Sequence, residues 1–301
     1  MWRRRCELDR APKEKRSKVV RYLVVYAALA VSLVIVLFPV YWIVSTSFKP
    51  MQEWLAWPPA WLPSKLEVFN YLILFAPKMF DPTGAFARNP VTPSIINSLI
   101  IAGASTITAL VVGYLAAYAI SRYGTGGNFM YFFVLLTRMT PPIAMAIPLL
   151  VFLSFLGLVD THLGLVLMYS TFTVAYVIWM MKSFIDDIPR DIEMAAMLDG
   201  YSDWAVIFRV TLPLVKGGLA ASGLFTFILN WSEFLLAFTF THSKAVTIPF
   251  QIATLSSAVS GMMYGPISAF SIVAVIPMMI IGYAIQNYLT RGLTFGAVRG
   301  R

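Results

Sequence analysis

The sequence predicts an all-α membrane protein with six transmembrane helices and both termini in the cytoplasm. Its 301 residues are 59% hydrophobic and 12% charged, and the mean hydropathy of +0.75 is far above that of soluble domains. The apolar residues gather in runs close to the roughly 20 residues with which a helix crosses a bilayer. Lysine and arginine concentrate in alternate connecting segments, and this bias indicates how the chain is threaded through the membrane.

The N-terminal segment, residues 1–21, is strongly basic. It holds nine lysines and arginines against three acidic residues, so we interpret it as a cytoplasmic anchor that orients a first transmembrane helix over 22–46. We expect no cleavable signal peptide, because the apolar run is longer than a signal sequence and lacks a small-residue cleavage site. Cys6 is the single cysteine, which excludes an intrachain disulfide and a cysteine metal site.

An outer loop is expected over residues 47–93. Three tryptophans and three prolines lie close together near its start, at Trp54, Trp57, Trp61, Pro58, Pro59 and Pro63. Indole rings favour the boundary between membrane and water, so this segment is predicted to lie on the outer surface.

The remaining transmembrane helices are predicted from five apolar runs, at 98–120, 130–156, 164–181, 218–239 and 267–288. Small residues recur in the first of these runs and allow neighbouring helices to approach closely. The glycines of 121–127 predict a tight inner turn and no phosphate loop, since neither Lys-Ser nor Lys-Thr follows them. We expect residues 94–288 to form one transmembrane domain and residues 289–301 to form a cytoplasmic tail.

The positive charges are distributed as this topology requires. With both termini inside, the inner segments hold seventeen of the 23 lysines and arginines and the outer loops hold five. Such a bias favours the orientation with the N-terminus inside. We therefore interpret the net charge of +9 as a topology signal, and we expect no nucleic-acid partner.

One polar stretch, residues 188–213, stands between two predicted membrane helices. Pro189 suits the first turn of a helix, and Gly200 supplies the left-handed residue that ends it. Ser202 is a favourable cap for a second helix, which Pro213 is expected to stop. The stretch is thus predicted to be a short helical hairpin outside the membrane, on the cytoplasmic side.

The hairpin also resembles a known element. Ala195-Ala196, Asp199-Gly200 and Leu212-Pro213, at these spacings, resemble the EAA coupling loop of ABC importer permeases, in particular the carbohydrate (maltose-type) branch. The resemblance implies the type I ABC importer permease fold, with a loop that docks on a cytoplasmic ATPase subunit. The residues to which it assigns this coupling role are Glu193, Met194, Ala195, Ala196, Met197, Leu198, Asp199, Gly200, Leu212 and Pro213.

The sequence departs from the family pattern at one position. The family glutamate stands directly before the Ala-Ala pair, whereas this chain has Met194 there and Glu193 one residue earlier. Met194, Met197 and Leu198 are spaced to share one helix face. We therefore expect apolar docking on the ATPase, and we expect Glu193 to matter less.

Two charged residues, Arg138 and Glu233, fall inside predicted membrane helices. A charge that faces lipid costs ~2.5–3.5 kcal/mol on insertion scales, so both should face protein or a water-filled path. One interpretation is a translocation path lined by Arg138, Asn230, Trp231 and Glu233. The other is hydrogen bonding between helices, and the sequence does not choose between the two.

The tail sequence LTFGAVRG is similar to the C-terminus of maltose-type permeases. In that family the tail can reach between the ATPase subunits. The resemblance implies the same direction for Gly296, Val298 and Gly300, although Arg301 is an additional residue after the last glycine.

No catalytic motif is recognisable in the chain. Walker A, HExxH and GxSxG patterns are absent from the sequence, so we expect no enzymatic activity and no cofactor bound by this chain. ATP and Mg²⁺ would be bound by a partner ATPase. The expected partners are a second permease subunit, two cytoplasmic ATPase subunits, an extracytoplasmic solute-binding protein and membrane lipid.

The resemblance implies a permease subunit of an ATP-driven importer that moves a sugar by alternating access, with a di- or oligosaccharide as the expected solute. The protein would be a multi-pass component of a prokaryotic cytoplasmic membrane. A polyol or glycerol-phosphate importer is the alternative within the family. A secondary transporter that works alone is a further alternative, but it leaves the docking loop unexplained.

Overall fold

The computed structural model describes residues 2–80, 84–255 and 263–297, in which every regular element is a helix. The helices are α1 (Trp2–Ser47), η1 (Met51–Glu53), α2 (Phe69–Phe75), α3 (Pro77–Phe80), α4 (Ala85–Arg88), α5 (Val91–Tyr123), α6 (Gly127–Met139), α7 (Pro142–Phe155), α8 (His162–Asp186), α9 (Arg190–Leu198), α10 (Asp203–Ala205), η2 (Val206–Thr211), α11 (Leu212–Leu214), α12 (Lys216–Trp231), α13 (Leu235–Phe240), α14 (Ile248–Leu255) and α15 (Tyr264–Ala297).

The described chain forms two compact units. The first runs from α1 to Tyr71 and includes Tyr264–Ile272 at the start of α15. In it, the Asn70 amide donates to the backbone carbonyls of Ser47 at 2.9 Å and Lys49 at 3.1 Å. The Ser47 and Tyr71 hydroxyls also lie 2.9 Å apart. These bonds tie the end of α1 to the segment that follows it, so the predicted outer loop is partly folded.

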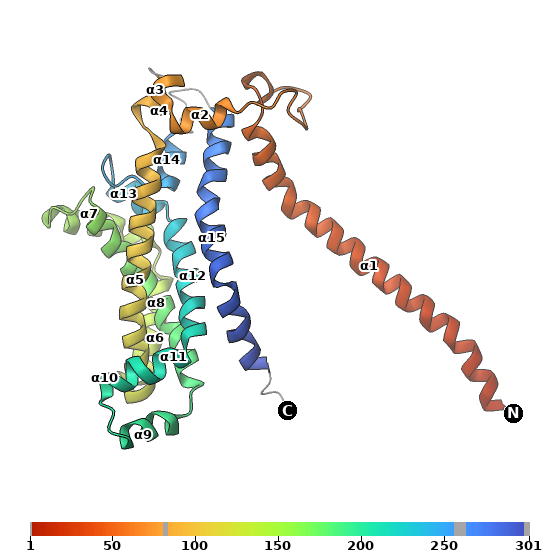
Figure 1. Ribbon diagram of the computed structural model, residues 1–301, viewed down its shortest axis with the longest axis vertical. Helices are drawn as coiled ribbons and strands as arrows, with labels where there is room; N and C mark the ends of the chain where they lie inside the picture. Colours follow the sequence, from red (N-terminus) through yellow and green to blue (C-terminus); the bar gives the residue numbers. More distant parts are fainter. Residues whose placement is uncertain (1, 81–83, 256–262, 298–301) are drawn as a thin grey trace. The chain divides into compact units, whose positions relative to one another are not determined.

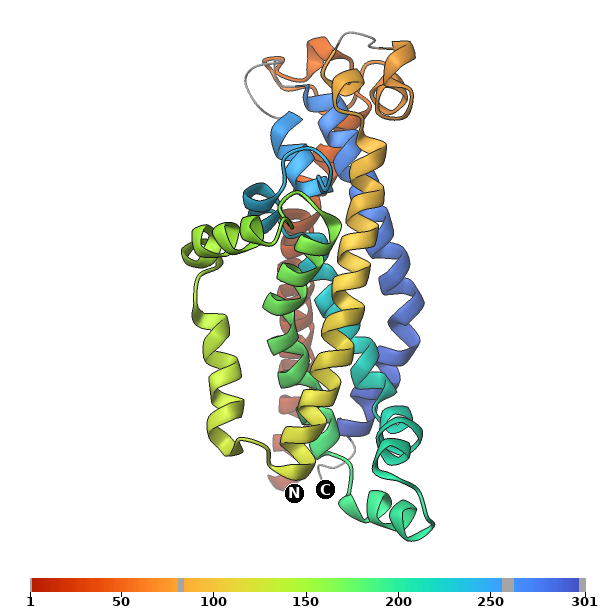
Figure 2. The same ribbon diagram turned by 90° about the vertical axis from the view of Figure 1, so that its left-hand side faces the viewer.

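The second unit is built around three long helices, α5, α8 and α12, that pack side by side (Figures 1 and 2). The predicted role of small residues is confirmed at Gly113, where an added Cβ would lie 2.6 Å from Cγ1 of Val177 on α8. Small residues Ala109 and Ala117 are buried in the same cluster. The close contact of α5 and α8 therefore depends on positions without bulky side chains.

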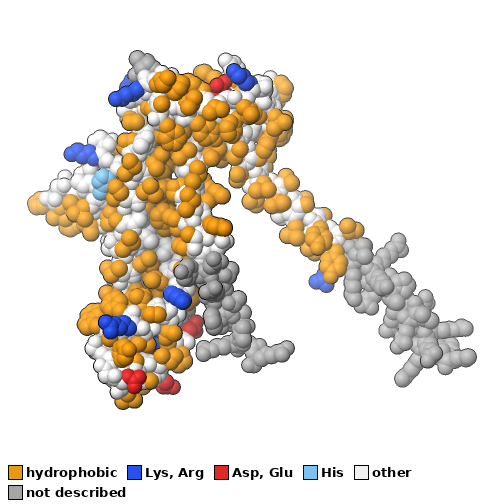
Figure 3. All heavy atoms as spheres, viewed as in Figure 1, with side chains coloured by type: hydrophobic (Ala, Val, Ile, Leu, Met, Phe, Trp, Pro, Cys, Tyr) orange, Lys and Arg blue, Asp and Glu red, His pale blue; other side chains and the backbone are white. Residues whose placement is uncertain are grey.

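Four described helices are long and apolar enough to cross a membrane. They are Arg21–Ser47 of α1, α5, α8, and Tyr264–Gln286 of α15. The pair Asp203–Leu214 and Lys216–Trp231 is bent by 78° and gives a fifth span if it is counted as one. In the second unit, hydrophobic side chains cover much of the visible flank, and charged side chains gather around α9 (Figure 3).

The prediction of one continuous helix over 130–156 is wrong. Residues 127–155 form two shorter helices, α6 and α7, separated at Thr140 and Pro141. Thr140 has extended backbone angles (φ −72°, ψ 121°), which is the conformation that a following proline favours. Pro141 and Pro142 together end one helix and begin the next.

The prediction of one continuous helix over 218–239 is also wrong. α12 ends at Trp231, and α13 begins only at Leu235. The interruption contains Glu233, whose carboxylate accepts a hydrogen bond from the backbone N–H of Leu236 at 3.0 Å. A carboxylate that satisfies a free N–H group at the start of a helix stabilises that helix, so this break has a local cause in the sequence.

Candidate coupling hairpin and membrane cavity

The first arm of the hairpin predicted over residues 188–213 is α9. Pro189 lies immediately before it with extended ψ of 131°, one position earlier than predicted. The turn after α9 is confirmed, because Gly200 has a φ of +88°, a conformation that glycine adopts without strain. The cap is confirmed as well, since the Ser202 hydroxyl accepts from the N–H of Ala205 at 3.4 Å.

The second arm differs from the ordinary α-helix that the sequence predicts. After α10 the chain forms a π-helical stretch, η2, a rare form that is frequent at functional sites. Pro213 does not end this arm, since it lies in the first turn of α11, where proline is tolerated. The arm ends instead at Val215 (φ −94°, ψ 13°).

An apolar surface is exposed on the hairpin, as predicted for its first arm. Met194, Met197 and Leu198 are 55%, 40% and 90% exposed. On the second arm, the exposed rings of Trp204 and Phe208 stack with centroids 6.0 Å apart. Exposed apolar side chains that gather on one surface are typical of a binding site for another protein.

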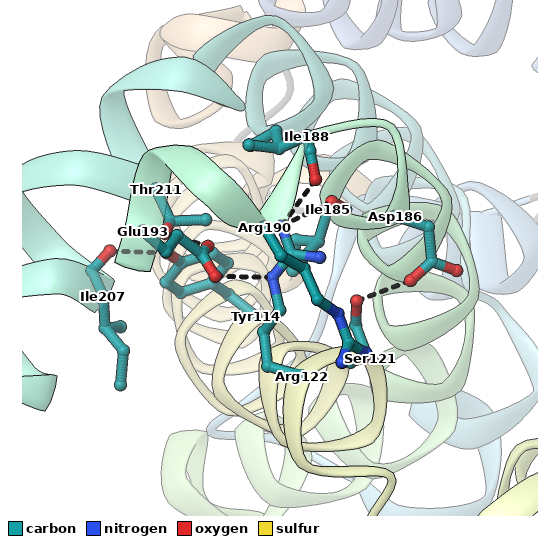
Figure 4. Close-up of polar contacts among 10 residues, drawn as sticks. All are labelled: Tyr114, Ser121, Arg122, Ile185, Asp186, Ile188, Arg190, Glu193, Ile207 and Thr211. Atoms are coloured by element: carbon teal, nitrogen blue, oxygen red, sulfur yellow. Dashed lines mark hydrogen bonds and ion pairs between the residues drawn. The ribbon is translucent and has the colours of Figure 1, made fainter. Parts of the chain in front are cut away.

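Glu193 points inward and is buried, with 5% of its surface exposed. Its Oε2 lies 2.7 Å from Nε of Arg122 in the last turn of α5, and its Oε1 accepts from the Thr211 hydroxyl at 2.6 Å. Figure 4 shows these contacts side by side. The carboxylate therefore joins α9 to both α5 and η2.

The guanidinium of Arg122 also holds the end of α8. Its Nη2 donates to the backbone carbonyls of Ile185 and Ile188, each at 3.0 Å (Figure 4). A second arginine, Arg190, donates from the first turn of α9 to the Ser121 carbonyl at 2.9 Å. The hairpin is thus attached to the C-terminal ends of α5 and α8.

Sequence reasoning missed Arg122, Thr211 and Tyr114 as parts of this site. Arg122 counted only as one of the inner positive charges, and Thr211 was assigned no contact. Tyr114 donates its hydroxyl to the Ile207 carbonyl at 2.7 Å, a contact between segments far apart in the sequence. A signal was present in the position of Arg122 beside the inner turn, but no spacing rule pairs it with Glu193.

A small cavity of about 80 Å³ lies beside the break between α12 and α13. Two polar residues, Asn230 and Glu233, and two aromatic residues, Tyr169 and Phe172, contribute to its wall. The full lining is Pro142, Tyr169, Phe172, Thr173, Leu229, Asn230, Glu233 and Leu236. The Asn230 amide donates to the Thr106 hydroxyl at 3.2 Å, and no described residue bonds to Oε2 of Glu233.

The other predicted path and tail residues have different outcomes. Trp231 is buried and its indole N–H donates to the Ala274 carbonyl at 3.0 Å, so it serves helix packing and does not line the cavity. The side chain of Arg138 lies outside the described part of the structure. In the tail, Gly296 belongs to α15, while Val298 and Gly300 lie outside the described residues.

The opposite end of the second unit is held by Asp160, which has a φ of +57°. Its carboxylate accepts from the N–H groups of His242 at 3.1 Å, Ser243 at 3.2 Å, Lys244 at 3.0 Å and Ala245 at 3.1 Å. Burial would raise the pKa of Asp160, but these donors outweigh it and hold the pKa at about 2. The segment between α13 and α14 is thereby fixed to the turn before α8.

Within residues 2–80, 84–255 and 263–297, no three His, Cys, Asp or Glu side chains are grouped as a metal ion would need.

Residues 109–295 match a family described as "Binding-protein-dependent transport system inner membrane component". The chain belongs to this family. The matched range includes the hairpin and the cavity. The chain is 32% identical to the trehalose/maltose transport system permease protein MalG of Thermococcus litoralis, over 95% of this chain and 99% of that protein. It is 34% identical to the trehalose transport system permease protein SugB of Mycobacterium tuberculosis, over 88% and 93%.

A solved structure shares the fold of this family member. It is a crystal structure of a bacterial ABC transporter involved in the import of the acidic polysaccharide alginate, with a TM-score of 0.74 and 22% identity, covering 91% of this chain and 98% of that chain. The predicted all-α importer permease fold and the resemblance to carbohydrate permeases are confirmed. The chain is a permease subunit of the cytoplasmic membrane and not itself an enzyme.

Proposed function

We propose that this permease carries a di- or oligosaccharide into the cell by alternating access, together with a second permease, two ATPase subunits that bind ATP and Mg²⁺, and an external solute-binding protein. The observation that carries the proposal is the near full-length match to a trehalose/maltose permease. In this arrangement, closure of the ATPase subunits displaces the hairpins, and the membrane helices then open outward to receive solute.

The exposed apolar surface of the hairpin is the proposed ATPase contact. Met194, Met197 and Leu198 are available there, and Glu193 is not, because Arg122 and Thr211 occupy both of its oxygens. Apolar contacts between two proteins are less sensitive to salt than exposed ion pairs. The ATPase contact of this subunit should therefore depend on apolar area.

The cavity beside α12 and α13 is the proposed point at which this subunit meets the solute. Asn230 and Glu233 offer oxygen acceptors for sugar hydroxyl groups, and Tyr169 and Phe172 offer ring faces. A carboxylate in this wall opposes an anionic solute. Among the alternatives, this disfavours a glycerol phosphate, whereas a neutral polyol would differ from a sugar mainly in size.

The proposed topology has six membrane crossings, with both termini inside and residues 94–288 as the transmembrane domain. In it, α6 with α7 and α12 with α13 are each treated as one interrupted crossing. A cysteine at Ser202, introduced after Cys6→Ser, should react with an impermeant thiol reagent only in inside-out vesicles. Labelling of intact cells from outside would contradict the topology and the coupling role together.

The function itself is tested in liposomes that contain the purified complex. We expect the chain to copurify with an ATPase, and we expect uptake of a sugar that its solute-binding protein binds, driven by ATP. Met194→Ala should weaken ATPase binding at low and high salt alike. Ile192→Ala is the matched control, because Ile192 is 43% exposed on a different face of α9. Uptake without any ATPase would refute the proposal.

A further inference from the structure

Both arms of the hairpin are attached to α5, a helix that is contiguous with neither arm in the chain. Arg122 of α5 meets Glu193 of the first arm at 2.7 Å. Tyr114, two turns earlier on α5, donates to the Ile207 carbonyl of the second arm at 2.7 Å. A rigid displacement of the hairpin would therefore act on α5 at two points about two helical turns apart.

The Arg122 contact is buried and uses most of the guanidinium. The side chains of Arg122 and Glu193 are only 7% and 6% exposed. One nitrogen of the guanidinium contacts the carboxylate, and another donates to the carbonyls of Ile185 in α8 and of Ile188 just after it. The planar guanidinium suits such divided contacts, whereas the single ammonium of lysine does not reach them all at once.

The covalent connections of the hairpin are less direct. Between α8 and α9 the chain passes through Asp187, Ile188 and Pro189, which are not helical. Toward α12 it passes the break at Val215, where the two helical segments meet at a bend of 78°. Non-helical joints absorb rotation, so a push on the hairpin is passed on poorly along the chain.

We propose that Arg122 is a positioning residue that fixes the hairpin to the inner ends of α5 and α8, so that the motion of the ATPase reaches α5 directly. Glu193 is the partner through which Arg122 holds the hairpin, and Thr211 extends the contact to η2. The inference rests on the proposed coupling function of the hairpin. It adds that α5, and not only the two helices flanking the hairpin, receives the motion.

Two variants separate a positioning role from a merely structural one. Arg122→Gln leaves the Glu193 carboxylate buried without a cation, which destabilises the fold. The double variant Arg122→Gln with Glu193→Gln removes both charges, and it keeps an amide oxygen to accept from Thr211. The double variant should therefore regain assembly, while the multiple bonds of the guanidinium remain lost.

The measurement is the ratio of solute taken up to ATP hydrolysed, in liposomes that hold the assembled complex and its solute-loaded binding protein. We expect the double variant to copurify with the ATPase in wild-type amounts and to lose about tenfold in this ratio. A wild-type ratio in the double variant would overturn the inference, because the pair would then be needed only for stability. Failure of the assembled double variant to bind the ATPase would also overturn it, since Arg122 would then act in docking.

The controls identify which hypothesis fails. Lys182 forms a neighbouring ion pair with Asp186 at 2.5 Å that is 23% and 44% exposed, so Lys182→Gln should leave the ratio unchanged. Absence of ATP-driven uptake by the wild-type complex would contradict the proposed function itself. Wild-type uptake together with an unchanged ratio in the double variant would contradict only the role of Arg122.

Discussion

Replacing Gly113 with alanine should push α5 and α8 apart. The added Cβ would lie 2.6 Å from Cγ1 and 2.7 Å from Cβ of Val177, and 3.4 Å from the backbone nitrogen of Ile178. The first of these contacts is about 1 Å shorter than the ~3.5–4.0 Å that carbon atoms prefer. Since Cβ of Val177 is attached to the backbone, no rotation of its side chain relieves the overlap.

The expected cost is that of overpacking, roughly 1–3 kcal/mol. Alanine also favours the helix over glycine by about 0.5–1 kcal/mol, so the net effect of Gly113→Ala is the difference between the two. Gly103 provides a matched control on the same helix, because nothing lies within 4 Å of a Cβ added there. Gly103→Ala should therefore gain only the helix preference of alanine over glycine, without any overpacking cost.

The assay is thermal inactivation of the purified complex in detergent, with both variants measured beside the wild type. Because both variants gain this helix preference, they differ by the overpacking cost alone. At about 2–4 °C per kcal/mol, Gly113→Ala should therefore inactivate roughly 2–12 °C below Gly103→Ala. Equal inactivation temperatures for the two variants would refute the assignment of Gly113 to the point where α5 and α8 touch.

Three further changes test the hairpin, the cavity and the outer turn. Gly200→Val should abolish uptake, because a β-branched residue at φ +88° costs ~1–3 kcal/mol, whereas Gly200→Asn, which tolerates this region, should keep it. Glu233→Gln should change the solute concentration at half-maximal uptake but still cap α13, whereas Glu233→Leu should lower thermal stability by about 1 kcal/mol. Asp160→Asn should lower the free energy that holds the segment between α13 and α14 in place by ~1 kcal/mol, allowing for solvent screening. Faster proteolysis of that segment would measure the loss. Because the pKa of Asp160 in the folded protein, about 2, is below its ordinary value of 3.8, its contribution to stability is present above pH 3.8 and is lost as the pH falls toward 2.

Contrary results are equally specific. Full uptake by Gly200→Val would show that the turn does not need its left-handed backbone. A stable and fully active Glu233→Leu would remove both the capping role and the solute contact. If Asp160→Asn resists proteolysis as well as the wild type does at neutral pH, the four N–H donors do not hold the outer segment.

Local features of this chain were predictable from the sequence because their causes are local. Gly200 and Ser202 each act within a few residues, and both have the predicted conformation. The long apolar runs of α5 and α8 likewise follow from composition alone. The division of the 130–156 run at Pro141 was not predicted. The two neighbouring prolines indicate a break, but the long hydrophobic run around them favoured a single membrane helix.

The burial of Glu193 could not be predicted in this way. Its helix position points it away from Met194, but only the packed structure shows that Arg122 and Thr211 occupy that side. The expectation that Glu193 matters less than Met194 therefore loses its basis, because a buried carboxylate is costly to remove without its partner. The π-helical stretch could not be predicted either, because the spacing of apolar residues over six positions does not distinguish a π-helix from an α-helix.

The π-helical stretch has a consequence for the phase of the second arm. A π turn amounts to one extra residue in an α-helix, so everything after η2 is rotated by about 100° relative to an uninterrupted helix. Deleting one residue between Val206 and Thr211 would restore the regular winding and remove that rotation. Thr211 would then leave the Glu193 carboxylate and Trp204 would keep its place, so the two arms would no longer be aligned. The single additional residue therefore sets the angle at which the hairpin returns to the membrane.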